Sequence, residues 1–555
     1  MKTRDFLLGM LACFSLGACS SENVVNNDVL TGGDSYVSIR LVTSNGDLDS
    51  RGSVGTGDSE FAIGTTAEAT VTNSHFYFYD NDGNYVTKGE TVSSIANTYP
   101  TETGGNEETR GTVNVVLRNV TSIPAYVLVV LNMNEGNADG KFKESLTKSY
   151  QALAESENGY GYTVTNAGGS TTYFTMTNST YIDGSNVVCA TPLSTNHLQK
   201  TEDLAEANPI TIHVERMAAK VCLSDDSAIT GHVNAQVLQD SESSSTEKQL
   251  TINVKYWGVN AVNKSSFYMK AIENTWDYNW WKPTETYYRT YWAKDPNYLE
   301  GYYPTSAENH ATATNWSLKY YTANEIEQAY NNGAAKYCLE NTLGENLLVD
   351  NGFMTKATSV VVVAEMKIGD TAEDLFIYKG VIYDKDNYIK VALSDLTASY
   401  KIYKSTDGST FTEIATSDVE IKSLTDGKIT LALTTEASAS TWYDKEDGSG
   451  NQISNFNDIF ATLNEADGYK NGLMYYSIPI EHLARTTVTS PYQVGDYGIV
   501  RNHVYQIKIN KIENLGKGIY DSDEVIVPNY DPETYFVAAE LHILSWKTVN
   551  QSVDL

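Results

Sequence analysis

The residues whose side chains could carry catalysis or hold a metal are spread thinly along this 555-residue chain. Its eight histidines form no HExxH pair, and the sequence contains no GxSxG elbow, phosphate-binding loop or dinucleotide fingerprint. The acidic side chains are abundant but dispersed among turns, where a solvated surface is their ordinary role. The sequence therefore predicts no catalytic residue, no metal site and no cofactor, and a protein that is not an enzyme.

One cysteine has a context that indicates covalent modification. A basic start and an apolar run over residues 6–16 lead into "LGAC", which ends at Cys19 and resembles a bacterial lipobox. We predict a signal peptide over residues 1–18 and an acylated Cys19, carrying palmitate or a similar chain. An ordinary secretory signal with a chance cysteine is the alternative. No later run of about 18 apolar residues exists, so lipid is the only membrane anchor that we expect.

The bond between Arg51 and Gly52 is a second candidate for chemistry, because it lies in a soft Gly/Asp/Ser-rich stretch. Directly before that stretch, Val37, Ile39 and Leu41 alternate with polar residues, which predicts a half-buried β-strand. A well-patterned strand is thus followed at once by a cleavable loop.

The amino-acid composition limits the fold classes and the kinds of partner that we expect. The formal net charge is −31 at pH 7, which argues against nucleic acid and against anionic membrane surfaces as partners. Abundant Tyr, Gly, Thr and Val favour strands and turns, and the length favours two domains. We predict a mainly β fold with two β-sandwich-like domains, over residues 52–240 and 249–536, and a few short helices. The polar stretch 240–248 is expected to be a linker or a long loop.

Periodicity places the main elements. Alternating apolar residues predict strands in both halves, at 75–79, 113–120, 125–132, 210–214, 358–367, 375–383, 388–391, 400–404, 429–433 and 504–512. Helical spacing from Phe142 to Leu153 predicts one helix that covers a sheet. Cys189, Cys222 and Cys338 are too few for a disulfide framework, so we expect buried free thiols.

An aromatic-rich segment runs from Trp276 to Tyr303. Exposed rings stack on sugars, so Trp280, Trp281 and Trp292 are candidate glycan-binding residues. The alternative is that these rings pack inside the second domain, where large aromatic side chains usually lie.

Several fragments together resemble the Bacteroidetes-type fimbrillins, the type V pilins, and are most similar to the minor-fimbria fimbrillin group. They are "AYVLVVLN" (125–132), "VERMAAKV" (214–221), "YCLENT" (337–342), "YYSIPIEH" (475–482), "YGIVRNHVYQIKINKI" (497–512) and "AAELHILSWKTVNQSVDL" (538–555). The resemblance spans nearly the whole chain. It implies a structural subunit of a cell-surface fimbria that supports adhesion.

The resemblance also implies a route of assembly. Such pilins are exported as lipoproteins to the outer membrane, where an arginine-specific surface protease removes the first strand. The matching bond here is Arg51–Gly52, so residues 19–51 would be lost. Arg110-Gly111 repeats the dipeptide within "TETGGNEETRGT", which the sequence indicates is flexible, but a cut there would not release the first strand.

The emptied groove would then accept a strand from an identical or related fimbrial subunit by donor-strand exchange. The expected donor lies in residues 537–555, where Val549, Val553 and Leu555 share one face and Gln551 interrupts the apolar row. An ordinary last strand of its own domain is the alternative for this tail.

A different class of function also stays open. The chain could be a monomeric outer-surface lipoprotein that binds glycans through the aromatic-rich segment. Under either interpretation, receptors on host or bacterial surfaces are expected partners.

Overall fold

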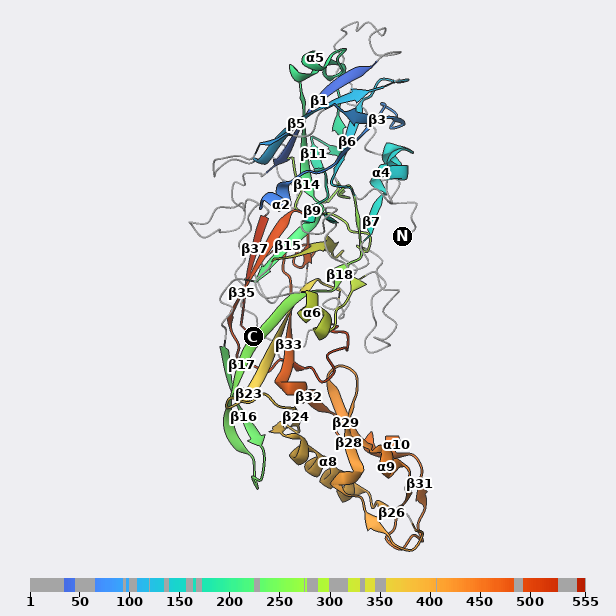
Figure 1. The fold of residues 1–555 in the computed structure, drawn as a ribbon, viewed down its shortest axis with the longest axis vertical. Helices are drawn as coiled ribbons and strands as arrows, with labels where there is room; N and C mark the ends of the chain where they lie inside the picture. The colour runs from blue at the N-terminus through green and yellow to red at the C-terminus, as the bar shows by residue number, and fades with distance from the viewer. Residues whose placement is uncertain are drawn as a thin grey trace.

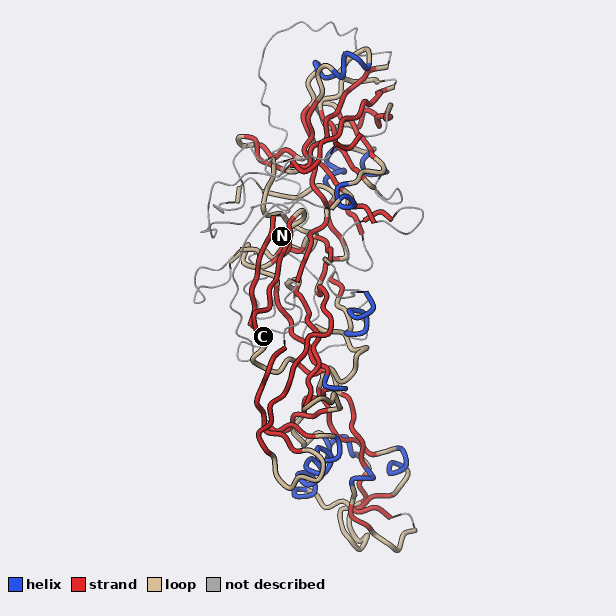
Figure 2. The backbone as a smooth tube through the Cα atoms, turned by 60° about the vertical axis from the view of Figure 1, so that its left-hand side comes forward, coloured by secondary structure: helices blue, strands red, loops and turns tan. Residues whose placement is uncertain are grey.

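The alternating pattern produces strands through most of the chain, and the computed structural model is mainly β with a few short helices (Figure 2). It describes residues 34–44, 65–92, 96–98, 107–118, 120–133, 139–155, 163–165, 172–223, 230–273, 275–276, 288–298, 318–329, 335–344, 356–405, 407–483, 493–527 and 547–554. The predicted fold class is confirmed. No helix in these ranges is both long and apolar enough to cross a bilayer.

The first unit is a nine-stranded sheet at the upper end of the elongated molecule (Figure 1). Its strands are β1 (Ser35–Ser44), β2 (Ser74–Tyr79), β3 (Tyr85–Thr91), β4 (Ala96–Thr98), β5 (Glu107–Leu117), β6 (Tyr126–Leu131), β10 (Met176–Asn178), β13 (Thr191–Pro192) and β14 (Ile210–Arg216). The order β1-β14-β10-β6-β2-β3-β5 returns to β1, because β1 pairs with both β14 and β5. The sheet is therefore closed by β1, the first strand of the chain.

The second unit packs two sheets on one core. The larger has ten strands: β16 (Thr230–Leu238), β17 (Thr246–Asn260), β23 (Ser359–Ile368), β24 (Leu375–Tyr378), β25 (Val381–Tyr383), β28 (Val419–Ser423), β29 (Lys428–Leu433), β32 (Ala466–Tyr469), β33 (Leu473–Pro479) and β36 (Lys517–Gly518). The smaller has β15 (Ala218–Leu223), β21 (Lys336–Leu339), β35 (His503–Lys511) and β37 (Lys547–Asp554), in the order β21-β15-β35-β37. Side chains of both sheets share one buried cluster, the arrangement of a β-sandwich.

Pairing of strands places the boundary between the units earlier than the polar stretch suggested. β15 and β16 lie before residue 240, yet β15 pairs with β21 and β35, and β16 pairs with β17. Residues 240–245 form the turn between β16 and β17 rather than a linker. The change of unit falls between β14 and β15, at Met217. A polar turn and a polar linker have the same composition, so only the pairing distinguishes them.

Short paired strands fill the remaining positions. They are β7 (Leu153–Glu155) with β19 (Ser265–Phe267), β8 (Thr163–Thr165) with β9 (Thr172–Phe174), β11 (Tyr181–Asp183) with β12 (Asn186–Val188), β18 (Val262–Asn263) with β20 (Leu318–Lys319), β22 (Asn341–Thr342) with β34 (Gly498–Ile499), and a four-stranded set, β26 (Tyr403–Ser405), β27 (Thr412–Glu413), β30 (Thr441–Tyr443) and β31 (Gln452–Ile453).

The described helices are short, with one exception. They are α2 (Thr66–Ala69), α3 (Asp139–Phe142), α4 (Leu146–Tyr150), α5 (Glu202–Glu206), α6 (Ala323–Ala329), α8 (Lys385–Ser399), α9 (Thr435–Ser438) and α10 (Phe456–Phe460). The predicted single helix over 142–153 is wrong. Ser145 interrupts it by capping α4, its side chain accepting from the Lys148 amide, and Leu153 belongs to β7.

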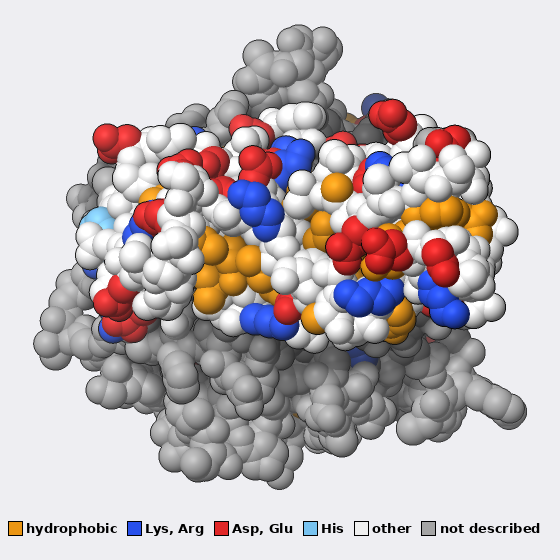
Figure 3. Space-filling view, turned by 90° about the horizontal axis from the view of Figure 1, so that it is seen from below, with side chains coloured by type: hydrophobic (Ala, Val, Ile, Leu, Met, Phe, Trp, Pro, Cys, Tyr) orange, Lys and Arg blue, Asp and Glu red, His pale blue; other side chains and the backbone are white. Residues whose placement is uncertain are grey.

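The predicted strand at 388–391 is also wrong, because these residues lie in α8. Asp384 caps that helix by accepting from the amide of Asn387 at 2.9 Å. Ile389, Leu393 and Leu396 then fall on one buried helical face. Helix α8 belongs to the lower end of the molecule, where acidic, basic and apolar side chains lie close together on the surface (Figure 3).

Buried ion pairs lie where the two units meet. Lys270 donates to Glu215 of β14 at 2.9 Å, with both side chains at most 1% exposed. Arg501, just before β35, donates to Glu340 at 3.1 Å and to the carbonyl oxygen of Tyr268 at 2.8 Å. The Lys270–Glu215 pair joins the end of the first unit to the second, whereas Arg501 links segments of the second unit beside that junction.

Removing one partner of such a pair leaves a buried charge. We expect Arg501→Met to lower the free energy of unfolding by about 3–5 kcal/mol. Arg118→Met is the matched control, because Arg118 forms only exposed ion pairs, with Asp34 and Glu90. Urea unfolding of both variants tests this, and equal losses would contradict the expected cost of leaving Glu340 buried and unpaired.

A buried carboxyl in the same region predicts a pH dependence. Asp295 is 3% exposed, and burial raises its pKa to about 7, although the amides of Asn297 and Thr342 donate to it. The folded state therefore holds this proton at pH values where the unfolded state has lost it. We expect stability to fall as pH rises from about 4 to about 7 and Asp295→Asn to reduce that fall. Melting temperatures at pH 5 and pH 8 for both proteins measure it, and unchanged pH dependence would contradict it.

Candidate assembly site

The candidate site is the position of β1, which we call the slot: the space between β5 and β14. β1 runs antiparallel to β5 along its whole length and parallel to β14 from Ile39 to Thr43. Its polar backbone groups are thus satisfied from both sides, as in a central strand. Residues 45–64 connect β1 to the rest of the first unit. A single cut within them would therefore separate β1 from everything that follows the cut.

The inner face of β1 is part of the core of the first unit. Val37 and Ile39 have no exposed surface and Leu41 is 5% exposed, in a cluster with side chains of β5, β6 and β14. Burying three aliphatic side chains contributes roughly 5–9 kcal/mol. These three side chains form the buried inner face of β1, and without β1 the closed sheet would lose its continuity.

The outer face of β1 is covered by a strap that precedes β14, residues 194–209. The Tyr36 amide donates to the Gln199 carbonyl at 2.7 Å, and the Gln199 amide donates back at 2.9 Å. Helix α5 of this strap packs over β1 and β5 at the top of the molecule (Figure 1). As a result Ser38 on the outer face is as inaccessible as its inward neighbours.

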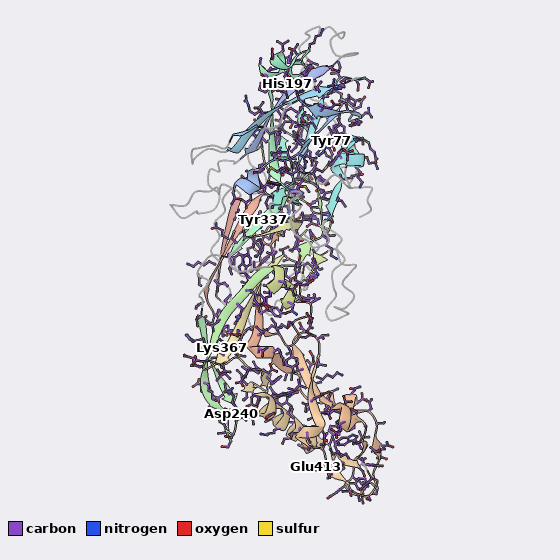
Figure 4. The ribbon with its side chains drawn as sticks, in the orientation of Figure 1. Tyr77, His197, Asp240, Tyr337, Lys367 and Glu413 are labelled. Atoms are coloured by element: carbon purple, nitrogen blue, oxygen red, sulfur yellow. The ribbon has the colours of Figure 1, made fainter. Side chains whose placement is uncertain are left out.

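Helix α2, the first described element after β1, is anchored at the junction of the two units. Glu68 of α2 accepts from Lys220 of β15 at 2.8 Å and from the Tyr337 hydroxyl, and its own carbonyl accepts from Arg216 at 2.7 Å. Burial would raise the pKa of Glu68, but Lys220 and Tyr337 hold it below its ordinary value. Tyr337 lies midway along the molecule (Figure 4). A cut before α2 would therefore leave the rest of the chain firmly held.

The tail forms the edge strand β37 on its own second unit. It runs parallel to β35, with Val549 opposite Tyr505 and Val553 opposite Ile509. Leu555 lies outside the described residues, as do the side chains of β37. Among the described strands, β37 is the last of its sheet and pairs with β35. The tail thus occupies a position with half the strand pairing that β1 has.

The structure changes the interpretation of Arg110. This residue lies within β5, where its backbone pairs with Val42 of β1 and with Thr98 of β4, and not in a flexible loop. A protease needs an extended, unpaired segment, so the Arg110–Gly111 bond is protected. Arg51, Gly52 and Cys19 lie outside the described residues.

One candidate glycan-binding ring is corrected. Trp292 has no exposed surface; its indole donates to the Tyr298 hydroxyl at 3.3 Å and it packs with Leu343 and Val500. A ring without exposed surface cannot stack on a sugar, so the packing alternative holds for Trp292. Trp280 and Trp281 lie outside the described residues.

The other chemical expectations concern cysteines and metals. Cys189 and Cys338 are buried free thiols and Cys222 is a partly buried one. Within the described ranges no three His, Cys, Asp or Glu side chains gather in a way that could hold a metal ion.

Comparison with known proteins adds a family. The family model for the C-terminal part of fimbrillin, the major fimbrial subunit protein type IV, matches residues 467–552, from within β32 to within β37. Over this region the chain is similar to fimbrillins. The match supports a fimbrillin-type fimbrial subunit at the cell surface, associated with other fimbrial subunits and structural in role.

Two further comparisons add little. A solved fimbrial assembly protein from Parabacteroides distasonis is 15% identical with a TM-score of 0.25, over 60% of this chain and 82% of that one. A similarity of this size supports no conclusion about function. The comparison with curated proteins gives no match.

The slot predicts a measurable property of the chain without β1. In a protein that begins at Gly52, we expect the β5 amides that bond β1 to exchange hydrogen rapidly, while those that bond β3 stay protected. A synthetic peptide of residues 35–44 should restore protection, and the same peptide with Ile39→Asp should not. Hydrogen exchange read by mass spectrometry tests this, and protection without any peptide would mean that the sheet closes without β1.

Proposed function

We propose that this chain is a fimbrial subunit, of the minor-fimbria fimbrillin group, that polymerises by donor-strand exchange after proteolysis at Arg51. It is exported as a lipoprotein through Cys19 and held at the outer membrane until an arginine-specific surface protease cuts Arg51–Gly52. The polymer supports adhesion through receptors on host or bacterial surfaces. The observation that carries the proposal is the position of β1, which completes a closed sheet although a single cut after it would free it.

The energetics support this order of events. With β1 in place the slot is full and no second strand can enter, so the uncut chain is inert. Loss of β1 exposes two rows of backbone groups and the apolar wall that had covered Val37, Ile39 and Leu41. Such an edge binds an extended strand through main-chain hydrogen bonds and alternating pockets.

The donor in this proposal is the tail of a neighbouring copy. In its own second unit β37 pairs with β35 alone, whereas a strand in the slot pairs with β5 and β14 together. Each additional net backbone hydrogen bond contributes about 1 kcal/mol. Transfer of the tail from an edge position to a central position therefore lowers the free energy.

Cleavage-dependent polymerisation is the test of this function. We expect the full chain with an arginine-specific protease to give ladders on unheated gels and Arg51→Ala to give only the intact monomer. Arg110→Ala is the matched control and should polymerise normally, because that bond lies within a paired strand. Deletion of residues 547–555 should leave cleavage intact and abolish ladders. Polymerisation of the Arg51→Ala protein would overturn the proposal, as would polymerisation of the deletion.

A further inference from the structure

The outer wall of the slot is acidic: its neutral side chains Ser38 and Asn114 are buried, Glu202 above them is partly buried, and Glu206 is exposed. Asn114 of β5 lies directly opposite Ser38 of β1, so the two side chains share the outer face. The Asn114 amide nitrogen donates to Glu202 at 2.8 Å and to Glu206 at 2.5 Å, one carboxylate from each end of α5. Ser38 has no exposed surface and Asn114 is 5% exposed. Two carboxylates thus converge on one neutral pair beneath the strap.

This chamber limits what the occupant of the slot can present. The Ser38 hydroxyl and the Asn114 amide oxygen are buried without a hydrogen-bond partner in the described part of the chain. A small neutral side chain fits there at the cost of one unsatisfied hydroxyl. A carboxylate at the position of Ser38, which has no exposed surface, would lose its solvation and lie close to two groups of the same sign, and both effects are unfavourable.

We propose that Glu202 and Glu206 select the register of the incoming strand and that the tail of a second copy enters with Ser552 in the place of Ser38. This inference rests on the proposed function, in which the tail of one copy fills the slot of the next.

The sequence of the tail offers three registers that keep Val549 and Val553 on the inner face. They place Asn550, Ser552 or Asp554 at the position of Ser38. Asp554 is excluded by the two carboxylates. With Asn550 there, Gln551 would replace Ile39, whose side chain has no exposed surface and whose backbone lies between β5 and β14. A long amide without a partner at that depth is costly.

With Ser552 at the position of Ser38, the inner positions are filled more favourably. Val553 then replaces Ile39, one branched aliphatic side chain for another. Gln551 replaces Val37, which has no exposed surface either but lies before Ile39, where the pairing of β1 with β14 begins. A serine again lies beneath α5, so the outer chamber keeps the group that it holds in the uncut chain.

The test introduces one extra carboxylate into the donor tail, in two separate variants that alter neighbouring positions on its outer face. We expect Ser552→Asp to slow polymerisation of the cleaved chain on the order of tenfold or more. Asn550→Asp should polymerise like the wild type, because position 36 lies opposite Val116 rather than opposite Asn114, which binds the two carboxylates. Glu202→Gln/Glu206→Gln in the acceptor copy should restore assembly with the Ser552→Asp donor.

Each outcome has a defined meaning. Rescue of Ser552→Asp by the double glutamine acceptor supports the selection. A block by Asn550→Asp with normal assembly of Ser552→Asp overturns the register, and equal blocks that the acceptor does not relieve overturn the role of Glu202 and Glu206. Absence of polymer from the cleaved wild type contradicts the proposed function itself. Tail variants change only the edge strand β37, and monomer melting temperatures confirm that each donor is folded.

Discussion

The structure depends on one constraint: a central β-strand must satisfy its backbone on both sides. β1 meets it by pairing with β5 and β14, and its inner side chains complete the core of the first unit. An edge strand can leave a sheet at modest cost, whereas loss of a central strand leaves two unpaired edges and an exposed core. That difference makes the presence or absence of β1 a switch between a closed unit and one that must find a replacement.

The rest of the molecule keeps that switch local. Helix α2, the first described element after the cleavable segment, is held at the junction by the contacts of Glu68 with Lys220 and Tyr337. The buried pair between Glu215 and Lys270 ties the first unit to the second, and the buried pair between Glu340 and Arg501 holds segments of the second unit beside it. Because these contacts do not involve β1, the frame around the slot and the sandwich that bears the tail can persist while the slot changes its occupant. In a polymer, these contacts would transmit a pulling force from one exchanged strand to the next.

The strand that the chain could donate is held more weakly than the strand that it would lose. β37 lies at an edge and contacts one neighbour, while the slot offers two. The polar outer face under α5 adds selectivity to this difference, since apolar pockets alone accept any register shifted by two residues. In the proposed assembly, carboxylates next to the buried position of Ser38 would distinguish among such registers, because each register places a different tail residue there.

The sequence by itself determined the elements whose pattern is local. Alternation predicted β1 with Val37, Ile39 and Leu41 inward, and it predicted β23, β29 and β35 to within a residue or two. It mistook α8 for a strand, since four residues with alternating polarity fit either period, and the Asp384 cap decides the outcome only in three dimensions. It also assigned β15 and β16 to the wrong unit and Arg110 to a loop, because pairing partners lie far away in the chain.

Only the tertiary structure decided that β1 closes its sheet from both sides, that Trp292 is enclosed, and that Glu202 and Glu206 meet over Asn114. Those are non-local contacts, set by the topology of strands separated by up to 170 residues or so, and no local pattern of residue types encodes them. The alternating pattern of a strand specifies which of its faces is buried. The neighbouring strands, which are distant in sequence, determine what that face packs against.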